Sequence, residues 1–510
     1  MKGSFSIDLA RVSGIANASL IVLAAIFFLL GNFFSFYFHF ATVFFVLLTA
    51  VNSYYLFGQR EHALLSNFGF MAQIRYLLES VGPEFRQYLF MSDVEEKPFN
   101  RTERSEVYRK SKAVDSSASF GSLNPFNGSD FMLRHSMFPV KKADLEEYRL
   151  SFSNPYGDDY VINKPILISG MSYGALSAKA IRALSRGAKA SGIVMNTGEG
   201  GYPKYHMMEG ADLIFQIGTA KFGVRDEQGK LCDNRLAELS KKDEIKMIEI
   251  KFSQGAKPGK GGMLPKEKIT EEISELRGVA MGEDVLSPSA HSECSDLTST
   301  VEYIHHIQKV SKIPVGIKIC LGRVDELKEL FREMKRTSVF PAYITVDGAE
   351  GGTGAAPKAF MDDVGVPLFE ALPIVHGLLV ELEMREKIRI LAAGKLVDPG
   401  RQFVALSLGA DAIYSARGFM LAIGCIQALQ CNANTCPVGI TSHDPKMTRG
   451  LDIDLKALRV QNYVENLMKD HKELMASMGI KKLSELSARN ILFPNNEKFQ
   501  GAVRGSGNLQ

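Results

Sequence analysis

The chain contains 510 residues, of which 60 are Lys or Arg and 57 are Asp or Glu, giving a formal net charge of +3. No segment has the dense Lys and Arg block that follows a phosphate backbone, so nucleic acid is not an expected partner. The length allows about three average domains, or one α/β barrel with insertions and additional segments.

An apolar N-terminal segment is the first feature along the chain. Between Arg11 and Arg60 there is no Asp, Glu, Lys or Arg. Because a membrane-spanning helix needs about 20 apolar residues, we predict a two-helix transmembrane hairpin within residues 1–60. Its predicted parts are helices near 14–30 and 34–57, joined by a turn at Gly31-Asn32. A cleaved signal peptide is the alternative, but a second apolar segment follows at once.

Basic residues flank this hairpin on both sides, whereas its turn carries no charge. Lys2 and Arg11 precede the hairpin, and Arg60 and Arg75 follow it. By the positive-inside rule, both ends of the hairpin lie in the cytoplasm. We therefore expect a multi-pass protein of the inner (cytoplasmic) membrane whose catalytic domain faces the cytoplasm.

Residues 61–150 are predicted to connect the hairpin to the rest of the protein. From residue 64 to 89 apolar residues recur at every third or fourth position, which indicates a juxtamembrane helix interrupted at Gly82-Pro83. Residues 95–130 are rich in Ser, Asn, Lys and Arg. For them we predict an extended connection over the surface rather than a separate fold.

Between residues 151 and 440 short apolar runs alternate with helical patterns, which is typical of βαβ units around a parallel sheet. The eight predicted strands are 165–170, 192–197, 213–218, 247–252, 314–319, 342–347, 388–393 and 411–416. Eight strands are enough to close a barrel, and residues 441–510 are predicted to form a helical tail. The predicted fold class is therefore α/β, a (β/α)8 TIM barrel preceded by the transmembrane hairpin.

Glycine-rich or polar segments follow nearly every predicted strand, at the end where barrels of this class hold their active sites. Glycine lets backbone N–H groups approach an anion closely, so the set predicts a phosphate-bearing cofactor. For any single segment, a tight turn is the alternative. The segments are GMSYGALS from Gly170, NTGEGG from Asn196, QGAKPGKGG from Gln254, DGAEGGTGA from Asp347, AGK around Gly394 and ARG around Arg417.

Three of the six cysteines, Cys425, Cys431 and Cys436, lie in the run GCIQALQCNANTCPVG. Such spacing before a proline is typical of a chain that wraps an iron–sulfur cluster. Three thiolates without a fourth nearby suit a 3Fe-4S cluster better than a 4Fe-4S cluster or a zinc site, and three buried thiols are the alternative. The other three cysteines are scattered and indicate no disulfide framework, as in a reducing cytosol.

Over roughly residues 150–495 the sequence resembles the FMN-binding synthase domain of the glutamate synthase family. The motifs that carry the resemblance are SGMSYGALS (169–177), NTGEGG (196–201), QGAKPGKGG (254–262), SPSAH (287–291), DGAEGGTGA (347–355) and NTCPVG (434–439) followed by SHDP. They occur in the order typical of the family, and the resemblance continues through SMGIKKLSELSARNIL. The chain is most similar to stand-alone, membrane-anchored members that carry only this domain.

The resemblance implies a (β/α)8 barrel that binds FMN at its mouth beside a 3Fe-4S cluster. It also implies reductive amination, in which ammonia condenses with 2-oxoglutarate and the reduced flavin delivers hydride to give L-glutamate. The flavin supplies the chemistry and the protein supplies position and charge.

The resemblance also implies roles for individual residues that match the family's motifs. Lys318, at the end of the fifth predicted strand, is the expected catalytic cation beside the flavin, where negative charge develops on reduction. Ser172, Asn196 and Gln254 are expected beside the flavin ring. The expected phosphate-binding residues are Gly351, Gly352, Gly394, Arg417 and Gly418.

Four further residues are expected to serve the substrate. Lys257, with Lys260 as a helper, would bind the carboxylates of 2-oxoglutarate. Glu199 and His291 would move protons, although an acid that only orders a loop and a structural histidine are the alternatives.

Departures from the complete synthase leave several questions open. No amidotransferase domain precedes the barrel, so free ammonia, a separate glutaminase or another amine would supply nitrogen. No GxGxxG fingerprint follows a strand, so an external donor such as ferredoxin or a flavoprotein subunit is expected. GKGG and AAGK replace the family's GEGG and ADGG, which leaves the substrate's identity open.

Two other functions fit the sequence. One is a membrane-associated flavin and iron–sulfur dehydrogenase that oxidises an amino or hydroxy compound. The other is a non-catalytic flavin-binding membrane module, which the cysteine motif disfavours because ligands for a redox cluster serve electron flow. The sequence also leaves a homo-oligomer open.

Overall fold

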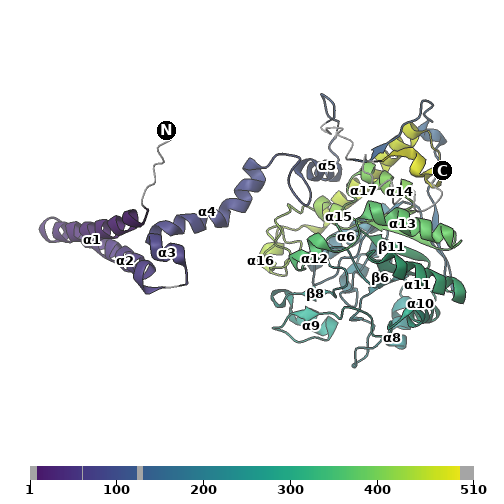
Figure 1. The fold of residues 1–510 in the computed structure, drawn as a ribbon, viewed down its shortest axis with the longest axis horizontal. Helices are drawn as coiled ribbons and strands as arrows, with labels where there is room; N and C mark the ends of the chain where they lie inside the picture. The colour runs from purple at the N-terminus through teal and green to yellow at the C-terminus, as the bar shows by residue number, and fades with distance from the viewer. Residues whose placement is uncertain (1–8, 60, 116, 123–129, 494–510) are drawn as a thin grey trace. The chain divides into compact units, whose positions relative to one another are not determined.

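The computed structural model describes residues 9–59, 61–115, 117–122 and 130–493. The chain divides into two compact units, Met1–Arg101 and Thr102–Gln510. Figure 1 shows the helices of the first unit and the α/β architecture of the second. The predicted site residues all belong to the second unit.

The regular secondary structure in the described part of the first unit is helical (Figure 1). Its elements are α1 (Leu9–Phe33), α2 (Phe38–Ser53), the π-helix η1 (Tyr54–Gly58), α3 (Ala63–Phe68), the 3-10 turn η2 (Gly69–Met71), α4 (Ala72–Phe85) and the π-helix η3 (Arg86–Phe90). The segments Ile15–Phe33 and Phe38–Gly58 are long and apolar enough to cross a membrane. The two predicted apolar helices are therefore present.

The turn between α1 and α2 lies after Phe33, so the predicted turn at Gly31-Asn32 is wrong. Gly31 is instead a contact point between the helices. A Cβ at Gly31 would lie 2.5 Å from the ring of His39, so only glycine lets that ring approach the backbone of α1.

The predicted helix interruption at Gly82-Pro83 is also wrong, because α4 continues through Pro83. The break occurs earlier, at Gly69, whose φ of 53° is a conformation that favours glycine. Asn52 from α2 stabilises this break, since its Oδ1 accepts a hydrogen bond of 2.5 Å from the backbone N–H of Phe70. Its amide donates to Asn17 of α1 at 3.0 Å, so one buried side chain joins three helical segments.

Eight parallel strands in the second unit form a closed barrel, and all eight predicted strands are confirmed. They are β4 (Ile166–Ile168), β5 (Met195–Asn196), β6 (Leu213–Ile217), β7 (Ile245–Lys251), β10 (Val315–Ile319), β11 (Tyr343–Asp347), β12 (Arg389–Ala393) and β13 (Ala412–Ser415). Each strand pairs with its neighbour along the chain, and β13 pairs with β4 to close the ring. The (β/α)8 TIM barrel is thereby established.

Helices surround the barrel (Figure 1). The longer ones are α6 (Ala178–Ser191), α8 (Asp233–Ser240), α10 (Leu297–Ser311), α11 (Val324–Thr337), α13 (Leu368–Glu381), α14 (Pro399–Ser407) and α17 (Ile453–Met478), which packs against α6. Shorter elements after the strands are α7 (Lys204–Met207), β8 (Met263–Leu264), α9 (Glu271–Arg277), β9 (Val285–Leu286), α12 (Lys358–Asp363), α15 (Arg417–Ala422) and α16 (Pro445–Thr448). Residues 441–493 contain α16 and α17 and end in β14 (Ile491–Leu492), which pairs antiparallel with β1 (Met132–Leu133), and residues 494–510 of the predicted helical tail lie outside the described residues.

An antiparallel hairpin, β2 (Leu150–Phe152) and β3 (Tyr160–Ile162), packs against the beginnings of the barrel strands. Phe152 is fully buried and its ring lies edge-on to Tyr343, with ring centroids 5.4 Å apart. The N-terminal end of the barrel is therefore filled with apolar side chains, which leaves the C-terminal end for the functional site.

Residues 95–130 are not wholly the extended connection that we predicted, because Arg101–Ser111 forms helix α5. Lys110 is buried and pairs with Asp470 of α17 at 2.5 Å and with Glu106 of α5 at 2.6 Å. The helix lacks a strong apolar stripe because part of its inner face consists of buried charged residues, so hydrophobic periodicity could not reveal it.

Gly316 in β10 provides a test of packing inside the barrel. A Cβ at Gly316 would lie 2.3 Å from the ring of Tyr343 on the neighbouring strand. We expect Gly316→Ala to destabilise the protein by about 1–3 kcal/mol through overpacking, measured as a lower Tm in detergent. Gly322→Ala is the matched control, since a Cβ at Gly322 would have no atom within 4 Å; an equal effect of both changes would contradict the packing argument.

Candidate active site

Loops from three strand ends converge on the carboxylate of Glu199, in the segment after β5. A Cβ at Gly218, after β6, would lie 2.3 Å from Glu199 Oε2. One at Gly262, in the segment after β7, would lie 2.8 Å from Oε1. Two glycines therefore make room for this carboxylate at the C-terminal end of the barrel.

Three cations act on Glu199. Lys251, at the end of β7, pairs with Glu199 Oε1 at 2.5 Å, and Lys257 and Arg277 contribute electrostatically. Burial opposes ionisation of Glu199, but these cations hold its pKa below the ordinary value. Glu199 is therefore ionised at neutral pH, and the surrounding group carries an excess of positive charge.

Burial strongly affects Lys257, one of these cations. Its side chain is buried and its Nζ donates to the carbonyl of Ala355 at 3.1 Å. Burial lowers its pKa to about 8, Lys251 adds to the effect, and Glu199 opposes it. Lys257 therefore titrates closer to neutral pH than an ordinary lysine does.

Lys318 lies in β10, inside the barrel, with its Nζ 3.3 Å from Asp347 Oδ2. Burial opposes its charge, but Asp347 and Glu249 raise the pKa of Lys318 above the ordinary value. The same oxygen of Asp347 accepts the backbone N–H of Gly255 at 3.0 Å. Lys318 is thus a permanently charged group fixed between the ends of β7, β10 and β11.

Glu249 of β7 is fully buried inside the barrel. Its carboxylate accepts hydrogen bonds from side chains on three other strands. Asn196 donates at 2.8 Å, Gln216 at 2.7 Å and Thr345 at 2.7 Å. Asn196 Oδ1 also accepts the N–H of Gly198, so its amide is engaged on both sides by the protein. This geometry favours a positioning role for Asn196 in the NTGEGG segment.

Ser172 and Gln254 lie in loops at the same end of the barrel and are partly exposed. A Cβ at Gly200 would lie 2.5 Å from Ser172 Cβ, which shows that the loops after β4 and β5 touch. Ala256 donates to the carbonyl of Ala349 at 3.1 Å, which joins the loops after β7 and β11. The sequence-predicted neighbours of the flavin ring thus come from loops that contact one another in pairs.

The predicted phosphate-binding residues come together at the ends of β11, β12 and β13. Arg417 Nη2 donates to the carbonyl of Glu350 at 2.6 Å, and a Cβ at Gly352 would lie 2.9 Å from Arg417 Nε. Glu350 in turn accepts the N–H of Leu368 at 3.0 Å, and Leu368 is one of the nearest residues to Gly394. These contacts connect the loop after β11 with the segments after β12 and β13.

Two other glycines of the predicted set are closely packed. A Cβ at Gly351 would lie 3.0 Å from Asp347 Oδ1, and one at Gly418 would lie 2.6 Å from Ser415 Oγ. Their lack of a side chain allows the backbone to approach the strand ends, which is the property that an anion-binding loop needs.

His291 and Lys260 occupy less central positions than the sequence suggested. His291 Nε2 donates to the backbone carbonyl of Lys251 at 3.0 Å, and burial lowers the pKa of His291 to about 4. The imidazole is therefore neutral, and the geometry favours a positioning role. Lys260 is exposed, with its ammonium 5.7 Å from the ring centroid of Phe360.

The cysteine loop follows α15 and wraps without regular secondary structure from Cys425 to Cys436. Positive φ angles at Gln427, Leu429 and Asn434 turn its backbone repeatedly. Burial raises the pKa of the Cys425 thiol to about 11, with smaller contributions from Cys431 and Cys436. The three thiols are thus near enough to influence one another.

Cations and donors from distant segments support this loop. Lys268 is buried and donates to the carbonyl of Cys431 at 3.2 Å, and both Cys431 and Cys436 act on its charge. From α5, Tyr108 donates to the carbonyl of Cys425 at 2.6 Å. Within the residues described, no three His, Cys, Asp or Glu side chains are grouped to hold a single metal ion.

Sequence reasoning missed Lys251, Arg277, Asp347, Glu249 and Lys268. For Lys251 the only signal was a lysine near the end of a predicted strand. Arg277 belongs to a short helix between the QGAKPGKGG and SPSAH motifs, and its guanidinium donates to the carbonyl of Tyr173 at 2.9 Å.

The Lys257 environment gives a prediction that is independent of any activity. We expect acetylation of Lys257 by acetic anhydride, measured by mass spectrometry against pH, to have its midpoint near 8. Because Glu199 favours the protonated lysine, Glu199→Gln should lower that midpoint. Glu238→Gln, an exposed change on α8, should leave it unchanged. A midpoint that Glu199→Gln does not move would contradict the proposed coupling.

Comparison with known proteins agrees with this architecture. Residues 142–481 match the family model described as the conserved region in glutamate synthase. The chain is 36% identical over 491 residues to the glutamate synthase large subunit-like protein YerD of Bacillus subtilis, covering 88% of this chain and 93% of that protein.

An archaeal-type NADPH glutamate synthase of Thermotoga neapolitana is 35% identical over 353 residues, covering 68% of this chain and 66% of that protein. Among solved structures, a mutant flavocytochrome b2 with pyruvate bound is similar at a TM-score of 0.43 and 14% identity, covering 76% of this chain and 82% of that chain. The family match spans the whole barrel, including the loops that surround Glu199 and the cysteine loop. The chain therefore belongs to the glutamate synthase family.

Proposed function

We propose that the protein is an FMN- and iron–sulfur-dependent oxidoreductase that forms L-glutamate from 2-oxoglutarate and ammonia with electrons from an external donor. The observation that carries this proposal is the cationic group at the barrel mouth. Lys251, Lys257 and Arg277 surround one carboxylate, Glu199, beside loops that suit a phosphate-bearing cofactor. A dicarboxylate substrate needs such an excess of positive charge.

The residues present fit FMN. Arg417 and the glycines at the ends of β11 to β13 would hold its phosphate, with Arg417 as the charged partner. Lys318 would face the part of the ring where negative charge develops, because Asp347 holds its ammonium in place. When bound, FMN would supply hydride transfer.

The substrate would bind between the flavin ring and the cationic group. Lys257 would pair with one carboxylate of 2-oxoglutarate, and binding of that anion would favour its protonated form. Glu199 is ionised, so it would pair with the ammonium that supplies the amine and position it, while its lowered pKa makes it a weak base. His291 would fix the backbone of Lys251 and so the position of its ammonium.

The proposed reaction balances in two steps. Ammonia attacks the C2 carbonyl carbon, the C–O bond breaks, and water leaves as the C=N bond forms. Two electrons and two protons then reduce that imine, one C–H and one N–H bond forming, to give L-glutamate. The external donor, a ferredoxin or a flavoprotein subunit, replaces the two electrons.

The cysteine loop fits a negatively charged cluster. Cys425, Cys431 and Cys436 would bind the 3Fe-4S cluster, each thiolate as a ligand of a different iron ion. Buried Lys268 would offset the cluster's charge, because it already responds to two of the thiols. Electrons would enter through this loop.

We also propose that α1 and α2 anchor the protein in the cytoplasmic membrane, with the barrel in the cytoplasm. Their length and apolar composition support this proposal, as does the position of basic residues outside the hairpin. In cell fractionation, the protein should sediment with membranes and remain there after alkaline carbonate washing. Release by that washing would contradict an anchor.

Glutamate formation by the purified, anaerobically handled protein tests the proposed reaction. With FMN and cluster loaded, 2-oxoglutarate, ammonium and reduced ferredoxin should yield glutamate. Lys257→Met should raise the KM for 2-oxoglutarate at least tenfold, because it removes a cation that binds a carboxylate. Lys242→Met, an exposed change, is the control. Absence of glutamate, together with flavin reduction by amino or hydroxy compounds, would instead support a dehydrogenase.

Replacing one thiol tests the cluster ligands. Cys431→Ser should abolish the electron-paramagnetic signal of the oxidised 3Fe-4S cluster, because a ligand is lost, while the barrel remains folded by circular dichroism. Cys294→Ser, outside the cysteine loop, is the matched control and should retain the signal. An unchanged spectrum of Cys431→Ser would refute the assignment.

A further inference from the structure

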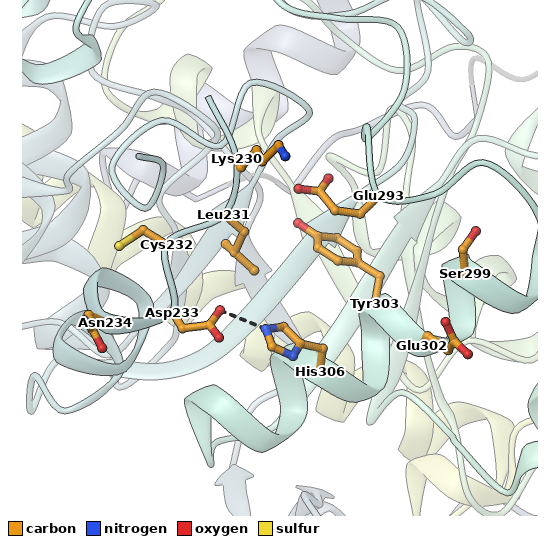
Figure 2. Close-up of a pocket in the computed structure, with 10 residues that line it drawn as sticks. All are labelled: Lys230, Leu231, Cys232, Asp233, Asn234, Glu293, Ser299, Glu302, Tyr303 and His306. Atoms are coloured by element: carbon orange, nitrogen blue, oxygen red, sulfur yellow. Dashed lines mark hydrogen bonds and ion pairs between the residues drawn. The ribbon is translucent and has the colours of Figure 1, made fainter. Parts of the chain in front are cut away.

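A cavity lies outside the predicted active site, on the outer wall of the barrel between α8 and α10 (Figure 2). Its volume is about 650 Å³. Its walls come from the residues before and within α8, from the segment preceding α10, and from α10 itself. No residue that lines it belongs to the predicted active site.

Tyr303 of α10 contributes an unsatisfied hydroxyl to this cavity. The side chain is 5% exposed, and within the part of the chain described its hydroxyl has no hydrogen-bond partner. Burial raises the pKa of Tyr303, so the group remains a neutral donor. A buried hydroxyl without a partner costs stability, which a ligand in the cavity would restore.

Charges of both signs lie near this hydroxyl. Figure 2 shows the Tyr303 hydroxyl pointing toward the part of the cavity where Lys230 and Glu293 lie. Glu293 acts electrostatically on Tyr303, which places its carboxylate close by. Burial opposes the ionisation of Glu293, but its pairing with buried Lys221 at 3.0 Å holds its pKa below the ordinary value.

The backbone around Lys230 is fixed although its side chain is exposed. Asp226 Oδ1 accepts the N–H of Lys230 at 2.8 Å, and the N–H of Asp226 donates to the Lys230 carbonyl, also at 2.8 Å. A bridge between Arg225 and Leu231 completes this tight hairpin. The loop that carries Lys230 is therefore ordered, so a ligand that binds there does not have to order its backbone.

We propose that this cavity binds a zwitterionic α-amino acid. The ammonium group of the ligand would pair with Glu293, its carboxylate would pair with Lys230, and the Tyr303 hydroxyl would donate to that carboxylate. Glu293 keeps Lys221 as a partner, so the ligand's ammonium would add a second cation to that pair, whereas a ligand without a carboxylate would leave Lys230 unmatched. Leu231 and the Tyr303 ring provide an apolar wall for a side chain.

The cavity also lies close to the active-site wall. The Tyr303 and His291 rings have centroids 5.4 Å apart, and His291 bonds to the backbone of Lys251, whose ammonium pairs with Glu199. The binding proposal itself does not depend on the proposed glutamate-forming reaction.

Isothermal titration calorimetry of the full-length protein in detergent against each of the twenty amino acids tests the proposal. At least one should bind. Its affinity should fall at least tenfold in Lys230→Met and in Tyr303→Phe, since each change removes one proposed partner. Lys242→Met, an exposed lysine just after α8, should bind as the parent protein does. Circular dichroism checks that each variant is folded.

The amine and the 2-oxo acid derived from the strongest ligand should each bind at least tenfold more weakly. The proposal is overturned if no amino acid binds, or if Lys230→Met and Tyr303→Phe both retain full affinity. It is also overturned if binding survives both changes but is lost in Lys257→Met, because the ligand would then occupy the barrel mouth.

Discussion

The buried carboxylate of Glu249 is the constraint on which the geometry of the site depends. A charge in the barrel interior costs several kcal/mol unless hydrogen bonds and an opposite charge compensate for it. Asn196, Gln216 and Thr345 donate to it, and Lys318 lies in its field. Strands β5, β6, β7, β10 and β11 are therefore held in one register at the end where the loops begin. The strand ends therefore give the side chains on those loops a fixed base.

The cations gathered around Glu199 are a second source of unfavourable electrostatic energy, because they repel one another. Burial and Lys251 lower the pKa of Lys257 to about 8, and Glu199 limits the decrease. The arrangement is strained in the absence of an additional anion and relaxed by one, which is the property expected of a site that binds a carboxylate. The same reasoning explains why glycine is needed at positions 218 and 262. A side chain at either position would collide with the Glu199 carboxylate, which offsets the charge of these cations.

The cysteine loop depends on segments that lie far from it in the sequence. Tyr108 of α5 and Lys268 hold its carbonyl groups, from positions more than 150 residues away. The loop has little regular structure of its own, so its shape is imposed by these contacts. A helix that sequence patterns did not reveal thus supports the cysteine loop, for which we propose a cluster.

The amino-acid sequence by itself determined the apolar hairpin, the eight barrel strands and the family, because continuous apolar runs and ordered motifs are local signals. It did not reveal the helix break at Gly69, which Asn52 of another helix stabilises, or helix α5, whose inner face includes buried charges. It also gave no role to Arg277. Only closure of the barrel brings that guanidinium to Glu199, and the energies of such charge contacts depend on distance and burial, which the tertiary structure alone sets.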